Sequence, residues 1–395
     1  MSTIRANIGN LRATLVALLA AALGSLAVLA VWPAFHDPVV WTPDALYYQE
    51  RLLEIRGADH QTAFKQAFEG PISADLRARD PHHTGSVSWV KYNEPFYERR
   101  VAVPLAGAAI EPLAGERSLL DLSLAGYVAS ILAVFGLLLL RFRVAIAAAV
   151  TVATIFLPPL TKHSSFPLTD SWGLALEIVA LGAAILALER GLRWLPFWVG
   201  AIALLSFTRD STWIPVVAAG WCAFRYRSRV PVTLFATGLA AALPALLIFQ
   251  TPVRDLLALL VNHSDVPSNP SWSFIVGHYP RALYELVRAN VGFLRRGEWF
   301  TAIYLVGGVL ALLALVWRRR TSSATTTLMT AGAILGLVYV LAAPVFSAFR
   351  LELVFVPMAA YGLALATELV ASRLNERFAV LDRLVVRPPA RARES

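Results

Sequence analysis

Asp44 is the first residue in this chain whose type and setting suit catalysis. It follows Thr42 and Pro43, a good start for a helix, because proline fits the first helical position. A carboxylate held beside an acceptor hydroxyl can take its proton as that oxygen attacks an electrophile. The structural alternative is that an acid in the first turn simply complements the helix dipole. Asp44 shares a predicted helical face with the apolar stripe Tyr48, Leu52 and Ile55, so its carboxylate is predicted to point inward.

Asp170 is the second such acid and follows Thr169 at the start of another predicted helix. Helix capping by either residue is again the alternative. Glu177 follows on the same helical face, roughly 10 Å further along the helix. An ionisable group at that depth of a membrane is costly and usually serves a function. The structural alternative for Glu177 is a buried pair with Arg209.

Lone arginines between apolar segments form the third feature. Arg209, beside Asp210, stands between two short runs, and Arg350 stands between two longer ones. The planar guanidinium matches the oxygens of a phosphate group, so these two arginines predict an anion site. Arg100 instead follows Arg99 in an aromatic run before Pro104, a mix that often only anchors a helix at the headgroup level. A hairpin turn made by the Arg209–Asp210 pair is the structural alternative.

Motifs of several enzyme classes are missing. The sequence contains no Walker loop, His-Glu-x-x-His, Gly-x-Ser-x-Gly or Cys/His metal spacing. We therefore predict no metal site; the sequence leaves the cofactor unknown, with a divalent metal possible but not indicated. The single cysteine, Cys222, precludes an internal disulfide.

Composition places these residues in a membrane. Hydrophobic residues make up 57% of the 395 residues, mean hydropathy is +0.60, and the apolar runs suffice to cross a bilayer of roughly 30 Å. The predicted fold class is an all-α polytopic transmembrane bundle, with one membrane domain over 1–371 and a basic tail over 372–395. About ten spans are predicted, over 11–32, 118–140, 144–160, 171–188, 195–208, 212–224, 230–250, 299–317, 326–345 and 351–371.

Arginine clusters orient these spans, because short cytoplasmic loops carry an excess of lysine and arginine. A cytoplasmic N-terminus puts the clusters at 141–143, 190–193, 225–229 and 318–320 inside, together with the tail. We therefore predict a cell-membrane protein with both termini cytoplasmic and two long outer loops, 33–117 and 251–298. The run Val101–Gly115 is then an interfacial helix, since a further span would invert every later cluster. The net charge of +9 fits this orientation, so no nucleic-acid partner is predicted.

In this order and on this common side, the residues resemble the GT-C superfamily of polytopic glycosyltransferases, which use lipid-phosphate sugars. The resemblance is one of layout over most of the chain, and its residues are Asp44, Tyr47, Tyr48, Arg100, Pro104, Thr169, Asp170, Thr208, Arg209, Asp210, Arg350, Phe355 and Pro357. Many members carry a large outer C-terminal domain, whereas this chain ends in a predicted cytoplasmic tail. Acceptor recognition would therefore fall to the loop 251–298.

The resemblance implies a GT-C-like fold and inverting transfer of a sugar from a polyprenyl-phosphate donor at the outer face. The acceptor would be a hydroxyl of a glycan, lipid or protein. Asp44 is then the expected catalytic base, and Asp170 orients the acceptor or the base. The expected substrate-binding residues are Arg209, Asp210, Arg350, Arg100, His163, Tyr48 and Glu177.

Three other functions stay open from the sequence. A transporter or flippase of a lipid-linked or anionic substrate would use Glu177 and Arg209 as its charges. An acyl- or phospho-transferase would favour His163 or His36 as the base. A non-catalytic assembly subunit would keep the scaffold alone.

Overall fold

The computed structural model describes residues 2–81, 87–249, 252–262, 266–267, 269–319, 323–342, 344 and 349–385. Within these ranges the chain is helical and contains no strand, which confirms the predicted all-α class. Parts of two predicted features lie outside the described residues: positions 82–86 of the first outer loop and the end of the tail at 386–395.

Seven segments of the described chain are long and apolar enough to cross a membrane. They are Ala13–Ala30 in α1, Ala102–Leu139 in α8 and α9, Asp170–Arg190 (α12), Arg229–Ile248 (α15), Trp299–Trp317 in α18 and α19, Ala324–Ala342 (α20), and Leu351–Leu374, mostly in α21. The bent pair α10 (Val144–Ile155) and α11 (Pro158–Ser164) raises the number to eight if it counts as one span. The chain is thus a multi-pass membrane protein by helix length and composition.

The predicted spans over 195–208 and 212–224 correspond to two shorter helices, α13 (Leu195–Ser206) and α14 (Trp213–Tyr226). Their lengths are 12 and 14 residues. They fall below the length of roughly 20 residues that crosses a bilayer without thinning it. The number of ten spans therefore stays a prediction.

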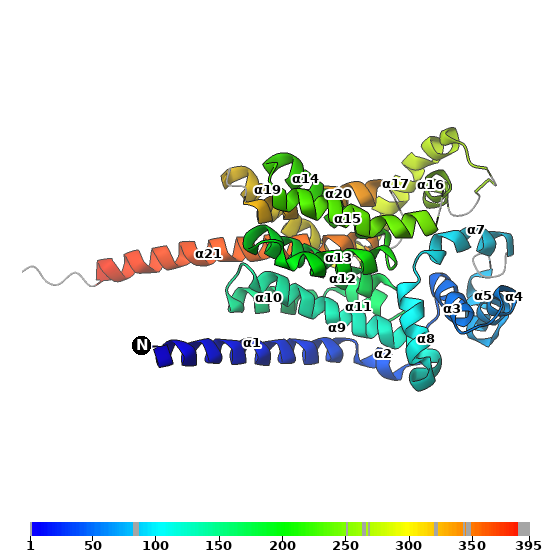
Figure 1. The fold of residues 1–395 in the computed structure, drawn as a ribbon, viewed down its shortest axis with the longest axis horizontal. Helices are drawn as coiled ribbons and strands as arrows, with labels where there is room; N and C mark the ends of the chain where they lie inside the picture. Colours follow the sequence, from blue (N-terminus) through cyan, green and yellow to red (C-terminus); the bar gives the residue numbers. More distant parts are fainter. Residues whose placement is uncertain are drawn as a thin grey trace, which may run out of the picture.

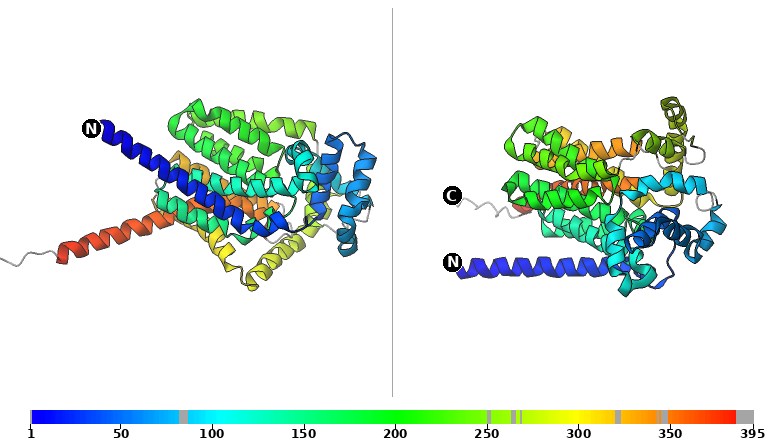
Figure 2. Two further views of the ribbon diagram at one scale, coloured as in Figure 1. Left: turned by 90° about the horizontal axis from the view of Figure 1, so that it is seen from below. Right: turned by 45° about the vertical axis from the view of Figure 1, so that its right-hand side comes forward.

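The helices of the two predicted outer loops lie at one end of the bundle (Figure 1). The first loop holds α2 (Trp32–His36), α3 (Pro43–Ile55), α4 (His60–Phe64), α5 (Ala74–Arg79), α7 (Val87–Glu98) and α8 (Ala102–Ala114), and the second holds α16 (Val253–Val261) and α17 (Trp272–Arg295). The N-terminal end of α1 (Ser2–Ala30) and the C-terminal end of α21 (Val356–Val385) lie at the opposite end (Figures 1 and 2). Helix α21 continues past the predicted boundary at residue 371.

Close packing fixes the start of α12, where Asp170 lies. Helix α9 (Ser118–Leu139) packs against α12, and a Cβ atom on Gly126 would lie 2.8 Å from Ser171 Oγ. The Ser130 hydroxyl donates to the Ser171 carbonyl at 2.8 Å, and Trp172 Nε1 donates to the Leu122 carbonyl at 2.7 Å. The first turn of α12 is thereby held by side-chain hydrogen bonds inside the bundle.

Helix α3 begins as its sequence predicts. The Thr42 hydroxyl accepts a hydrogen bond from the Ala45 amide at 3.3 Å, and Pro43 is the first helical residue. Tyr48 and Leu52 are buried, but Ile55 at the end of the predicted apolar stripe is exposed. The predicted face is therefore confirmed over its first three turns and wrong at its last residue.

Candidate functional site

Arg350 lies between the two predicted catalytic aspartates. Its Nη1 donates to Asp44 Oδ2 at 2.6 Å. Its Nε and Nη2 donate to the two oxygens of Asp170 at 3.0 and 2.9 Å, the two-pronged geometry that suits a carboxylate. One guanidinium therefore joins the first turn of α3 to the first turn of α12.

Arg209 is a second cation on Asp170, with its Nη1 3.0 Å from Asp170 Oδ1. Both side chains are buried, at 8% and 3% exposure. A Cβ atom on Gly173 would lie 2.2 Å from Arg209 Cγ, so the glycine makes room for the arginine. Thr169 makes no side-chain cap on α12. Asp170 therefore serves this ion-pair network rather than only a helix end.

Asp210 forms ion pairs with the other two arginines of the network. Arg100 Nη2 donates to Asp210 Oδ2 at 2.8 Å, and Arg99 forms an ion pair with Asp210 Oδ1. Arg100 Nη1 donates to the Tyr48 hydroxyl at 3.0 Å. That hydroxyl in turn lies 3.2 Å from the Thr169 hydroxyl. Tyr48 thus connects the Asp210 group to the start of α12, beside Asp170.

The second oxygen of Asp44 accepts a hydrogen bond from the Tyr97 hydroxyl at 2.7 Å. Burial alone would raise the pKa of Asp44, but the adjacent Arg350 and the Tyr97 hydrogen bond hold it below its ordinary value of 3.8. Asp44 is therefore a charged carboxylate at neutral pH. Sequence reasoning did not single out Tyr97 for this role, although it stands three residues before Arg100 in an aromatic run.

His163 and Glu177 flank the network, and within the described part of the chain neither forms an ion pair with it. His163, near the end of α11, is buried and its Nε2 atom has no hydrogen-bond partner. Glu177 is 1% exposed within α12, and its Oε1 atom is likewise unpartnered. The Ser211 hydroxyl donates a hydrogen bond to the Glu177 carboxylate. That carboxylate is also close enough to the Arg209 guanidinium for the two charges to attract.

The structure thus brings all nine predicted site residues to one place in the fold. Their roles stay predictions. Hydrogen bonds and ion pairs link seven of them: Asp44, Tyr48, Arg100, Asp170, Arg209, Asp210 and Arg350. Three residues outside the predicted site set complete the network, namely Arg99, Tyr97 and Thr169.

The network carries more positive than negative charge. Four arginines face three aspartates, and the Nε atom of Arg100 is a buried donor without a hydrogen-bond partner. A cavity on the Asp210 side of the network is lined by Arg99, Arg209, Asp210 and Trp213, among others, but not by Arg100. Its volume of about 10 Å³ is enough for one water molecule. A larger anion would enter only after side chains move.

No protein-family model and no curated protein matches this chain.

Proposed function

We propose that the chain is a membrane glycosyltransferase that moves a sugar from a polyprenyl-phosphate donor to an acceptor hydroxyl. The bridge from Asp44 through Arg350 to Asp170 is the observation that carries the proposal. It places a charged carboxylate beside an arginine-rich site with one positive charge in excess. The layout resemblance to the GT-C superfamily supports the same reaction class.

In the proposed reaction Asp44 accepts the proton of the acceptor hydroxyl. The acceptor oxygen then bonds to the anomeric carbon while the bond from that carbon to the phosphate oxygen breaks. The phosphate leaves with the electron pair, and the configuration of the sugar inverts. General-base help of this kind contributes roughly 10²–10⁴-fold. Stabilisation of the leaving phosphate by the arginines adds to it.

The geometry divides the arginines between two tasks. Arg350 already uses its Nε, Nη1 and Nη2 atoms on the two carboxylates. It therefore positions Asp44, and this role replaces the phosphate binding that the sequence had predicted for it. Arg100 keeps a buried Nε donor without a partner, and Arg99 lines the adjacent cavity. The donor phosphate is therefore assigned to the side of the network formed by Arg99, Arg100 and Arg209.

Asp44→Asn tests the proposal, because it keeps the size of the side chain but removes the base. Deletion of the gene should remove a sugar from membrane lipids or surface glycans, and the wild-type gene should restore it. Asp44→Asn should lower the rate of restoration by roughly 10²-fold or more with normal amounts of folded protein. Asp121→Asn is the matched control, since that half-exposed aspartate makes only a 3.7 Å pair with Arg117. Full activity of Asp44→Asn would refute the assignment.

Glu177 favours one second candidate, a transporter or flippase of an anionic lipid-linked substrate. Its carboxylate is buried in α12 with an unpartnered oxygen, as expected of a coupling group in a transporter. Under that function Glu177→Gln would abolish movement of the substrate, and Asp44→Asn would have little effect. The same two variants therefore separate the candidates.

The proposed orientation puts both termini in the cytoplasm and the network at the outer face. Single cysteines introduced at Ala58 and Ser271, in a Cys222→Ser background, should react with an impermeant maleimide added to intact cells. Both residues belong to the end of the bundle that carries α3, α4 and α17 (Figure 1). Reaction only after the membrane is opened would reverse the orientation.

A further inference from the structure

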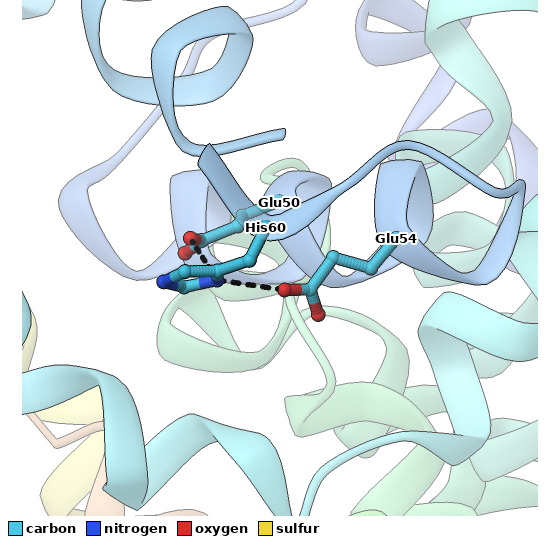
Figure 3. Close-up of side chains that lie close together, drawn as sticks. All are labelled: Glu50, Glu54 and His60. Atoms are coloured by element: carbon cyan, nitrogen blue, oxygen red, sulfur yellow. Dashed lines mark hydrogen bonds and ion pairs between the residues drawn. The ribbon is translucent and has the colours of Figure 1, made fainter. Parts of the chain in front are cut away.

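Three glutamates surround one histidine beside the later turns of α3. Glu50 and Glu54 project from neighbouring turns of α3 toward the His60 ring at the start of α4 (Figure 3). The His60 Nδ1 atom lies 2.8 Å from Glu54 Oε1, 3.6 Å from Glu50 Oε1 and 3.5 Å from Glu94 Oε1. One ring nitrogen is therefore shared among carboxylates from two helices, α3 and α7.

Glu50 is the member whose charge is least compensated. It is 4% exposed, and its Oε1 atom is buried without a hydrogen-bond partner, since 3.6 Å to His60 is too long for one. Burial, with the charge of Glu94, raises the pKa of Glu50 to about 8. The arginine beside the cluster, Arg51, pairs with Glu54 at 2.5 Å. A buried carboxylate without a partner is costly unless a cation reaches it.

The geometry suits a metal ion. One oxygen each from Glu50 and Glu54 and one nitrogen of His60 all lie within 4.8 Å of one another. Ligands at about 2.0–2.2 Å from a shared ion stand at most about 4.4 Å apart, so small side-chain rotations would complete the site. A cavity of about 10 Å³, lined by Glu50, Arg51, Glu54 and Glu94 among others but not by His60, leaves room for one water-sized particle next to the carboxylates.

We propose that Glu50, Glu54 and His60, with Glu94 as a fourth ligand, bind a divalent transition-metal ion of the Zn²⁺ or Mn²⁺ type. Carboxylates alone would also suit Mg²⁺ or Ca²⁺, but an imidazole ligand shifts the preference toward Zn²⁺ and its neighbours. The sequence does not show this site, because its ligands come from three helices with no motif spacing.

The ion would tie together the elements that hold Asp44. Helix α3 carries Asp44, Glu50 and Glu54, whereas α7 carries Glu94 and Tyr97, the hydrogen-bond donor to Asp44. Binding therefore fixes α7 against α3 and keeps Tyr97 on the carboxylate. This role is structural, and it holds whether or not the protein transfers sugars.

Metal binding by the purified full-length chain tests the proposal. After treatment with EDTA, the protein in detergent is titrated with ZnCl₂ or MnCl₂ by calorimetry, and its thermal unfolding is followed with and without metal. We expect one ion per chain and a higher unfolding temperature with metal. His60→Ala and Glu50→Gln should each weaken metal binding by at least about 10-fold. Loss of a residue that only orients a metal ligand already weakens binding by about 10-fold or more, so loss of a ligand should weaken it at least as much.

His36→Ala and Glu69→Gln are the matched controls, because both residues are exposed and neither belongs to the cluster. They should bind metal like the wild type. Equal affinity in all four variants, or no stoichiometric binding by the wild type, would overturn the site. If His60→Ala fails to fold, Glu50→Gln still decides, since it keeps the shape of the side chain. None of these readouts depends on sugar transfer, so failure here leaves the glycosyltransferase proposal intact.

Discussion

Helix α3 carries two buried charged regions whose charges are balanced in opposite ways. At its start, Asp44 meets Arg350 and belongs to a network in which arginines outnumber aspartates. Two turns later, Glu50 and Glu54 meet one histidine and a third glutamate. The first region lowers the pKa of Asp44, and the second raises that of Glu50 to about 8. The Asp44 side chain is 24% exposed and that of Glu50 is 5% exposed, so deeper burial and the neighbouring charges together raise the pKa of Glu50.

This contrast indicates what each region lacks. Each carboxylate of the arginine network forms an ion pair with an arginine, and the Arg100 Nε donor has no hydrogen-bond partner, which favours an anionic ligand. The glutamate cluster has an unpartnered carboxylate oxygen, which favours a cation. A variant that changes one region can therefore be compared with a variant of the other.

Asp170→Ala should produce the largest effect, because it removes an acceptor shared by Arg350 and Arg209. Breaking a buried pair by deleting one partner costs about 3–5 kcal/mol, since the remaining charge is left uncompensated. Thermal unfolding in detergent should show a large decrease in stability. Asp121→Ala deletes the acid of a half-exposed pair, which is worth at most about 1 kcal/mol. Equal losses in the two variants would show that the network contributes little to stability.

Gly173→Ala should come next, because the added methyl group meets Arg209 Cγ inside the bundle. Overpacking of this kind costs roughly 1–3 kcal/mol and would push Arg209 away from Asp170. Gly136→Ala in α9 is the control, since a Cβ atom there meets nothing within 4 Å. That variant should be neutral or stabilised through helix propensity. Stability and sugar transfer should both fall for Gly173→Ala alone.

The sequence predicts the local features of this site but not its distant partners. Thr42 and Pro43 predict the start of α3 because capping is local, and the structure confirms it. The inward position of Asp44 and Asp170 was also predictable from helical spacing. The partners were not, because Arg350 stands 306 positions from Asp44 along the chain. No local pattern shows that it bridges two acids or that Gly173 must lack a side chain.

Glu50→Gln should stabilise the metal-free protein at pH 8 and change its stability little at pH 4.5. The folded pKa of Glu50 lies above its ordinary value of 4.5, so the native state holds this proton longer than the unfolded state does. Stability therefore falls as the pH rises from about 4.5 through 8, and glutamine removes that loss. Unfolding at pH 8 and pH 4.5 in EDTA should show the gain only at pH 8.

Asp44→Asn should behave in the opposite way. Its folded pKa lies below 3.8, so the stability it contributes is present above that value and is lost as the pH falls through the folded pKa. The same unfolding measurements should therefore show a loss at neutral pH that shrinks in acid. A gain from Asp44→Asn at pH 8 would mean that the two regions do not differ in the way proposed.

Thr42→Ala should give the smallest effect and the most local one. Loss of an N-cap costs about 1 kcal/mol and frays the first turn, which contains Asp44. Glu50 and Glu54 lie beyond that turn and are held by contacts with α4 and α7, so Zn²⁺ affinity should stay within about 2-fold of the wild type. Sugar transfer should fall, and Thr42→Ser should restore it because serine caps as well as threonine. Ser271→Ala removes the corresponding cap from α17 and should change neither readout. Equal losses of transfer and metal affinity in Thr42→Ala would show that α3 responds as one rigid unit and that its two regions cannot be separated.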